Sequence, residues 1–314
     1  MSTMADRQNG CPAQIAFDLM HIVNVASVPQ RSPFRYPGGK TWLAPHIRQW
    51  LRQCDFSVGE FIEPFAGGAI VGLTVAFERL ARSVTLIEKD EDVAAVWMTI
   101  LNVRNGRWLA DRIAEFEFTE ENVRAALETP RWKLSFRERA FKTILRNRVQ
   151  RGGILAPGAG VMKIGENGRG LASRWYPETL SRRILAITEL RRRITFEQGD
   201  GIDAIRRNAP RRDVAFFIDP PYTVAGRRLY TCSDMDHEEL FRVIGRVSGD
   251  FLMTYDNTAE IRRLAERFGF ETRLIAMRNT HNTKMTELLI GRGLDWLQQQ
   301  GQDAPGLSDG PPLA

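Results

Sequence analysis

Residues Phe61-Ile62-Glu63-Pro64-Phe65-Ala66-Gly67-Gly68 carry the clearest indication of how this chain folds. Residues 61–63 read as a short strand, and the glycines after it indicate a tight turn before a helix predicted over residues 69–81. A second strand is predicted over residues 84–87. A strand, a helix and a second strand in this order predict a βαβ unit with two parallel strands.

Predicted strands and helices alternate on both sides of this unit. A turn at residues 37–39 and a helix over 41–53 precede it. Further on, strands are predicted at 194–197, 214–218, 250–255, 271–277 and 286–290, with helices at 237–247 and 258–268. This alternation predicts an α/β fold with a doubly wound, mostly parallel, Rossmann-like sheet covered on both faces. The last two strands are joined too briefly for a helical crossover, so we expect an antiparallel hairpin at one edge.

The middle of the chain has a different character. Residues 93–193 show helical spacing of apolar residues, which predicts an inserted, mainly helical lobe. The sheet domain is then built from residues 31–92 and 194–297. Residues 1–30 lack a clear period and residues 298–314 are polar, so both are expected to be flexible tails.

Arginine dominates the basic residues of this chain. Only six of its 44 basic residues are lysines, the formal charge is +6 and the isoelectric point is near 9.5. Arginine forks match phosphates and base edges, so the excess favours a polyanionic partner such as nucleic acid. A GC-rich coding sequence is an equally good explanation of the bias.

The cysteines and the hydropathy exclude several classes of protein. Cys11, Cys54 and Cys232 are far apart and show no CxxC spacing, which predicts neither a zinc site nor a disulfide framework. No segment approaches the roughly 20 apolar residues of a membrane span. We expect a cytoplasmic protein without a metal and without membrane association.

The glycine turn is a candidate nucleotide site. Bare glycine lets a ligand approach the backbone closely, and the amino end of the following helix faces the same space. Glu88 ends the second strand, 21 residues after Gly67. This spacing suits a carboxylate that binds a ribose, because the ends of neighbouring parallel strands meet at one edge. The alternatives are a tight corner for the turn and a solvated strand end for Glu88.

A sharper signal follows the predicted buried strand at residues 214–218. Asp219-Pro220-Pro221-Tyr222 must leave the sheet, because proline cannot continue a central strand. The two prolines fix the backbone and place Asp219 at the carboxyl edge of the sheet, where ligands bind in such folds. The alternative is a rigid loop with a packing tyrosine.

This loop suits methylation of an exocyclic amine. The N6 lone pair of adenine is delocalised into the ring, and two acceptors against its N–H groups would localise it. Asp219 and the carbonyl of Pro220 can be those acceptors and can stabilise the positive charge that develops on nitrogen. Tyr222 can stack on a base flipped out of the duplex. The loop has no cysteine, which argues against C5-cytosine methylation.

Several motifs in order carry a family resemblance. Phe34-Arg35-Tyr36-Pro37-Gly38-Gly39-Lys40, then residues 61–68, Glu88 and residues 219–222 resemble the Dam-like adenine-specific DNA methyltransferases. The resemblance runs from about residue 33 to 292. It implies transfer of a methyl group from S-adenosylmethionine (SAM) to N6 of a flipped-out adenine in double-stranded DNA, by a prokaryotic or phage-encoded enzyme that acts as a monomer.

The resemblance also implies which residues hold SAM. In the family, an aromatic residue and a lysine near the start contact the cofactor, and the lysine suits the methionine carboxylate. The Phe-x-Gly turn holds the methionine part, an acid binds the ribose, and a Gly-Asp pair lies beside the adenine moiety. The cofactor set is then Tyr36, Lys40, Glu63, Phe65, Gly67, Glu88, Asp200 and Asp219. Without the family, Lys40 reads as a surface lysine and Asp200 as a helix N-cap.

The inserted segment resembles the target recognition region of the family. The DNA-binding set implied there is Arg146, Asn147, Arg148, Arg151, Arg169 and Arg174. Phosphate contacts are the expected role of most of these arginines, and a solvated basic surface is the alternative. The loop at 152–170 lacks the Phe-Asn-x-Pro pattern of some relatives, so their recognition sequence is not transferred.

Other readings stay open at this stage. Loops with Pro-Pro-Tyr also serve N4-cytosine, RNA and protein-amide methyltransferases, although Ser or Asn is more usual there before the prolines. A relative that binds nucleic acid without catalysis is a further alternative. Roles in restriction-modification, in regulation and in phage are all compatible with the resemblance.

Overall fold

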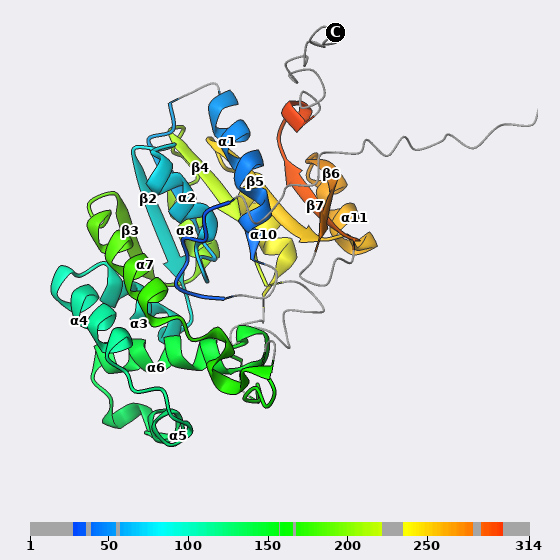
Figure 1. Cartoon of the computed structure of the whole chain (residues 1–314). Coiled ribbons are helices and arrows are strands. Elements are labelled where there is room, and N and C mark those ends of the chain that lie inside the picture. The colour runs from blue at the N-terminus through cyan, green and yellow to red at the C-terminus, as the bar shows by residue number, and fades with distance from the viewer. Residues whose placement is uncertain are drawn as a thin grey trace, which may run out of the picture.

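The computed structural model describes residues 28–35, 39–54, 57–156, 158–165, 168–221, 235–278 and 284–297. Seven strands form one sheet in the order β3-β2-β1-β4-β5-β7-β6 (Figure 1). They are β1 (Glu60–Glu63), β2 (Ser83–Glu88), β3 (Ile194–Gln198), β4 (Val214–Ile218), β5 (Asp250–Asp256), β6 (Glu271–Arg278) and β7 (Lys284–Gly291). Strands β1 to β5 run parallel, and β7 is antiparallel to both β5 and β6. The predicted doubly wound sheet with an antiparallel edge hairpin is confirmed.

Each central strand supplies both faces of the core. Phe61 and Phe217 pack into one hydrophobic cluster, whereas their chain neighbours Ile62 and Phe216 pack into another on the opposite face. All five residues of β4 are buried, as expected of a central parallel strand. The chain order reverses between β1 and β4, and this point is where ligands bind in doubly wound sheets.

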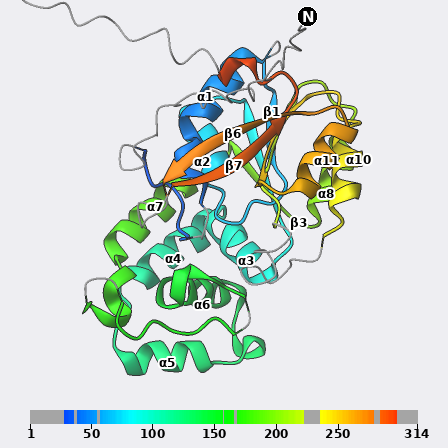
Figure 2. The same cartoon turned by 90° about the vertical axis from the view of Figure 1, so that its right-hand side faces the viewer.

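Helices cover both faces of the sheet. Figure 2 shows α1 (Ala44–Gln53) and α2 (Ile70–Glu78) on one side of it, and α8 (Gly201–Asn208), α10 (His237–Ile244) and α11 (Ala259–Arg267) on the other. A 3-10 turn, η2 (Lys40–Leu43), leads into α1.

Several helices differ from the prediction. Helix α10 ends at Ile244, before its predicted end at residue 247. Helix α2 ends at Glu78, before the predicted end, because Arg79 adopts a left-handed backbone with φ 56° that breaks the helix. Helix α8 was not predicted, and the structure adds it between β3 and β4.

A helical lobe fills the connection from β2 to β3. It consists of α3 (Glu91–Ile100), α4 (Val103–Ala114), α5 (Glu120–Glu128), α6 (Phe136–Val149) and α7 (Pro177–Glu189), with short 3-10 turns at Arg131–Lys133, Arg151–Gly153 and Gly170–Arg174. The lobe lies beyond the carboxyl ends of the parallel strands (Figure 1). Its buried Trp97, Ile144 and Ile184 join the same hydrophobic cluster as Phe61 of the sheet, so lobe and sheet share one continuous core. Within the described part of the chain, no helix is long and apolar enough to cross a bilayer.

Candidate active site

The predicted site residues follow neighbouring strands at one edge of the sheet. Glu63 ends β1, Glu88 ends β2 and Asp219 follows β4, and these three strands are adjacent. Asp200 follows β3 at the start of α8. Parallel pairing therefore brings motifs that are far apart in the sequence to one edge.

The glycine turn between β1 and α2 is held on two sides. Gly67 has a left-handed φ of 46°, and its N–H donates to Oε2 of Glu88 at 2.8 Å. The indole Nε1 of Trp97 donates to the carbonyl of Gly67 at 2.9 Å. The turn is thereby fixed to β2 and to the first helix of the lobe.

Glu88 accepts a second backbone hydrogen bond, from the N–H of Asp90 at 2.8 Å. Burial raises the pKa of the Glu88 carboxyl to about 6. Each carboxylate oxygen has a further lone pair, so the ionised group can also accept from a ligand hydroxyl. Glu88, the side chain predicted to bind the ribose, is therefore hydrogen-bonded to the glycine turn of the same site.

Glu63 lies beneath this turn and is almost completely buried. Its Oε2 accepts from the N–H of Gly72 at 2.7 Å, in the first half of α2. A Cβ at Gly72 would come within 2.5 Å of that oxygen, so the contact requires glycine. Burial, with a further contribution from the charge of Asp219, raises the pKa of the Glu63 carboxyl well above its usual range.

Asp219 is held by two donors on one oxygen. Its Oδ1 accepts from the hydroxyl of Thr254 on β5 at 2.7 Å and lies 3.0 Å from Nζ of Lys40. The Lys40 side chain is only 4% exposed, whereas that of Asp219 is 23% exposed. The same ammonium lies 3.2 Å from Oε1 of Glu287 on β7. Lys40 therefore bridges two carboxylates from different strands.

Phe65 and Asp200 meet the start of α8. A Cβ at Gly201 would come within 2.7 Å of the Phe65 ring, so the ring lies directly against the first turn of this helix. Asp200 caps α8 by accepting from the N–H of Ile202 at 2.9 Å, and it pairs with Nζ of Lys89 at 3.0 Å. The N-cap reading of Asp200 is correct, and its second oxygen is the one that pairs with Lys89.

Some residues of this edge lie outside the prediction or outside the described structure. Tyr36 and Tyr222 belong to the residues that are not described, while Pro220 and Pro221 follow directly after Asp219. Sequence reasoning missed Thr254 and Glu287. Their signal was weak, because each strand also contains other polar residues and no local pattern singles out Thr254 or Glu287. In the described part of the chain, no group of three His, Cys, Asp or Glu side chains is arranged to hold a metal ion.

Two of the predicted DNA contacts lie inside the lobe. The carboxamide of Asn147 is fully buried: it accepts from the N–H of Arg35 at 2.8 Å and donates to the carbonyls of Arg35 at 2.8 Å and Gly153 at 2.7 Å. Arg148 is also buried and donates to the carbonyl of Pro33, and burial lowers its pKa. Both side chains fasten residues 33–35 to α6, and neither lies at the surface.

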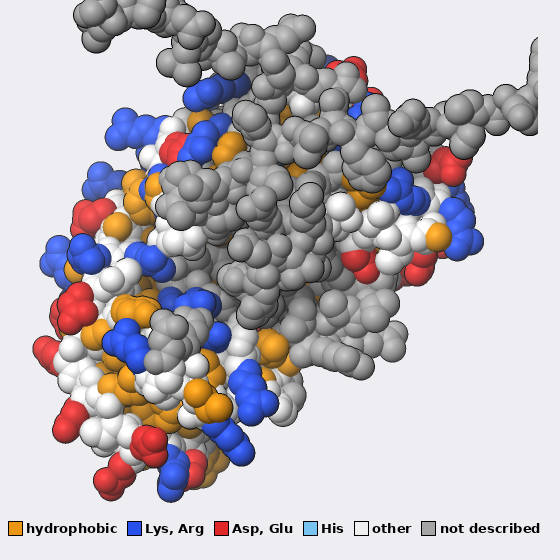
Figure 3. Space-filling view, turned by 45° about the vertical axis from the view of Figure 1, so that its right-hand side comes forward, with side chains coloured by type: hydrophobic (Ala, Val, Ile, Leu, Met, Phe, Trp, Pro, Cys, Tyr) orange, Lys and Arg blue, Asp and Glu red, His pale blue; other side chains and the backbone are white. Residues whose placement is uncertain are grey.

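The other predicted contacts are more accessible. Arg146 is about a quarter exposed, lies 3.3 Å from Asp92 and donates to the carbonyl of Leu155 at 2.9 Å. Arg151 and Arg169 are exposed, and Arg174 is half-buried. In Figure 3, basic side chains are interspersed with acidic ones over the lower part of the molecule, where Figure 1 places the lobe. These arginines stay predicted DNA contacts.

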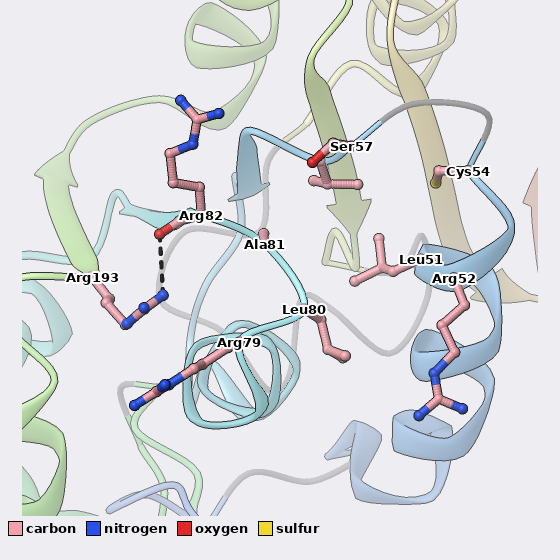
Figure 4. Close-up of a pocket in the computed structure, with 10 residues that line it drawn as sticks. Leu51, Arg52, Cys54, Ser57, Arg79, Leu80, Ala81, Arg82 and Arg193 are labelled. Carbon is pink, nitrogen blue, oxygen red and sulfur yellow. Dashed lines mark hydrogen bonds between the residues drawn. The ribbon is translucent and has the colours of Figure 1, made fainter.

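A cavity of about 690 Å³ lies at the opposite edge of the sheet, where α1 and α2 end and β1 and β2 begin. Four arginines line it: Arg52, Arg79, Arg82 and Arg193. Their guanidinium groups point in different directions, and Arg193 donates to the carbonyl of Arg82 (Figure 4). The arginines therefore do not converge on one point. None of the sequence motifs lies at this edge, so the cavity is separate from the candidate site.

Comparison with known families supports the assignment of the amino-terminal motifs. Residues 36–84 match the model of the D12 class N6 adenine-specific DNA methyltransferases. This range includes Lys40, β1 and the glycine turn, so the family resemblance is confirmed there. No curated protein matches the chain.

The solved structures that match this chain include methyltransferases. One from Geobacter sulfurreducens is 12% identical, with 83% of this chain and 80% of that chain covered and a TM-score of 0.36. An rRNA methyltransferase from Streptomyces viridochromogenes is 12% identical, with 85% of this chain and 89% of that chain covered and a TM-score of 0.38.

Proposed function

We propose that this chain is a SAM-dependent methyltransferase that methylates N6 of adenine in double-stranded DNA. The proposal rests on the position of Asp219, which Thr254 and Lys40 fix at one edge of the sheet. At the same edge, Glu88 accepts a hydrogen bond from the glycine turn at Gly67. The family match over residues 36–84 covers Lys40 and the turn.

The edge suits SAM by charge and by shape. Its carboxylates Glu88 and Asp219 contribute negative charge, which favours a cationic sulfonium. The Gly67 turn brings backbone close to the crevice, and Phe65 offers an apolar ring beside the start of α8. When bound there, SAM supplies an electrophilic methyl group, with Glu88 as acceptor for the ribose hydroxyls.

Asp219 would act on the target amine. As the N6 lone pair bonds to the methyl carbon, the bond from that carbon to the sulfonium sulfur would break and leave a neutral thioether. Positive charge develops on N6, and the amine later releases one proton to water. A carboxylate and the adjacent carbonyl of Pro220, held against the two N–H groups, stabilise that charge without a covalent intermediate. Thr254 and Lys40 fix Oδ1 of Asp219, so the orientation of the carboxylate is set before the base arrives.

The target base has to leave the duplex to reach this edge, because N6 is otherwise inside the helix. Tyr222 is the proposed stacking partner of the flipped base. Arg151, Arg169 and Arg174 on the lobe are the proposed phosphate contacts, with affinity that depends on salt.

The test is transfer of labelled methyl from SAM to unmethylated genomic DNA, followed by digestion to nucleosides and mass analysis. N6-methyladenine is the expected product. N4-methylcytosine would overturn the adenine assignment, and methylation of RNA or protein in place of DNA would overturn the substrate class. A parallel calorimetric titration with SAM separates failure of cofactor binding from failure of transfer.

A further inference from the structure

Glu287 belongs to none of the sequence motifs, yet it reaches the centre of the candidate site. It lies on β7, in the antiparallel hairpin at the edge of the sheet, and its side chain is 5% exposed. Its Oε1 lies 3.2 Å from Nζ of Lys40, which is 247 positions away in the sequence. That ammonium lies 3.0 Å from Oδ1 of Asp219.

We propose that Glu287 is a positioning residue for methyl transfer: it holds Lys40 so that the ammonium fixes Asp219 without cancelling its charge. This inference rests on the proposed function. It gives the carboxyl-terminal hairpin a role in the reaction beyond completion of the sheet.

The register of the strands explains how Glu287 arrives there. In the β5–β7 pair, Thr254 lies opposite Leu289, two residues from Glu287. Side chains two residues apart on a strand point to the same face, and Leu289 packs into the cluster on the face covered by α1 and α2. Lys40 begins η2, which leads into α1 on that face. An odd shift of register would turn the carboxylate of Glu287 to the opposite face.

Charge counting explains why a second carboxylate is useful. A buried ammonium paired with Asp219 alone would leave a neutral pair and a weakened acceptor. With Glu287 included, the three groups carry one net negative charge, which favours the positive charge that develops on the target nitrogen. The second contact also restricts the long, flexible lysine side chain, which otherwise has many rotamers.

Removing one partner of a buried pair often destabilises a protein whatever its function, so the test must separate position from stability. The variants are Glu287→Gln, which keeps size and removes charge, Lys40→Met, and the two combined. Glu266→Gln, a change of exposed charge on α11, is the matched control. For each protein, we would measure kcat for methyl transfer to duplex DNA, the dissociation constant of SAM and the melting temperature.

We expect Glu287→Gln to lower kcat about tenfold, with SAM affinity within about twofold of wild type. In the Lys40→Met background, the same change should have little further effect on kcat, because Glu287 acts through Lys40. Glu266→Gln should match wild type.

Two outcomes overturn the inference. One is an unchanged kcat in Glu287→Gln beside an active wild type. The other is full additivity of the two changes in kcat while their effects on melting temperature are coupled, which would make the contact a structural one only. A wild type that binds SAM and methylates no DNA instead overturns the proposed function, and the coupling in melting temperature still reports whether Lys40 and Glu287 interact.

Discussion

The carboxyl edge of the sheet and the last turn of α6 in the lobe both contain buried polar side chains, but these side chains have different partners. At the sheet edge, Asp219 meets Lys40 and the hydroxyl of Thr254, and it keeps partial exposure. In the last turn of α6, the carboxamide of Asn147 is fully buried and bonded to the backbone of Arg35 and Gly153. One set has an open side toward a ligand, and the other is enclosed.

This difference distinguishes buried polar side chains that stabilise the fold from those that are oriented toward a ligand. A buried side chain whose partners are backbone groups is held for the fold, since losing it leaves those groups unsatisfied. A carboxylate whose partners are an ammonium and a hydroxyl, and which stays partly exposed, is oriented for something that comes from outside. This contrast predicts that changes at the sheet edge alter turnover, whereas changes at Asn147 alter stability.

Asp219→Ala should lower kcat by a factor of about 10² to 10³, because it removes an acceptor aimed at the charge that develops in the transition state. The melting temperature should stay close to that of wild type, since the side chain is partly exposed. The measurement is methyl transfer to duplex DNA, with Asp295→Ala, an 84% exposed aspartate, as the control. Near-normal turnover in Asp219→Ala would show that the sheet edge is not oriented for catalysis and does not differ from the lobe in this respect.

The sheet could be predicted because strand signals are local. Residues 214–218 match β4, and the other strands were placed within a few residues. The topology then determines which strand ends meet, so the neighbourhood of Glu63, Glu88 and Asp219 follows from the order of the elements. Helix α8 was missed although Asp200, its N-cap, was recognised as a possible cap. Helix α10 has the same length of eight residues and was predicted, so length alone does not explain the omission of α8.

The side-chain directions in the lobe could not be predicted in the same way. Arg146, Asn147 and Arg148 are consecutive, so on a helix they point to different sides, and nothing local says which side meets residues 33–35. Glu287 could not be predicted as a site residue for a different reason. Its meeting with Lys40 depends on the register of an edge hairpin and on a contact across 247 positions.

Asn147→Ala should lower the free energy of unfolding by about 2–4 kcal/mol, because it leaves two backbone groups of Arg35 and the carbonyl of Gly153 without their partner. Urea unfolding measures this. Asn257→Ala, at an exposed asparagine, should change stability by less than about 0.5 kcal/mol. If Asn147→Ala unfolds like wild type but no longer binds DNA, Asn147 faces a ligand and does not stabilise the fold.

The affinity for SAM should fall at low pH through Glu88. Its pKa is raised by burial to about 6, so the carboxylate becomes protonated as pH falls through that value. Between pH 7.5 and pH 5.5, the ionised fraction and the affinity should fall roughly fourfold. The free energy of unfolding depends on pH in the opposite direction, because the folded state binds the extra proton at Glu88. Glu88 therefore stabilises the folded state below about pH 4.5, and this contribution is lost as pH rises through about 6.

Calorimetric titration with SAM at both pH values tests the prediction for Glu88. Glu88→Gln should bind SAM more weakly and flatten the pH dependence, because an amide does not titrate. The same pH dependence in wild type and in the variant would assign the effect to another group at the sheet edge.

The smallest effect is expected at the exposed arginines of the lobe. Arg151→Ala should weaken binding to non-cognate duplex only about two- to threefold near 0.1 M salt, and should reduce the slope of log affinity against log salt by about one. Stability should not change, because the side chain is exposed. Arg206→Ala is the matched control, since that arginine is exposed on α8 and paired with Asp203 and Glu239. Fluorescence anisotropy over a salt series measures all three proteins. An equal loss in the control, or binding that ignores salt, would show that Arg151 makes no phosphate contact.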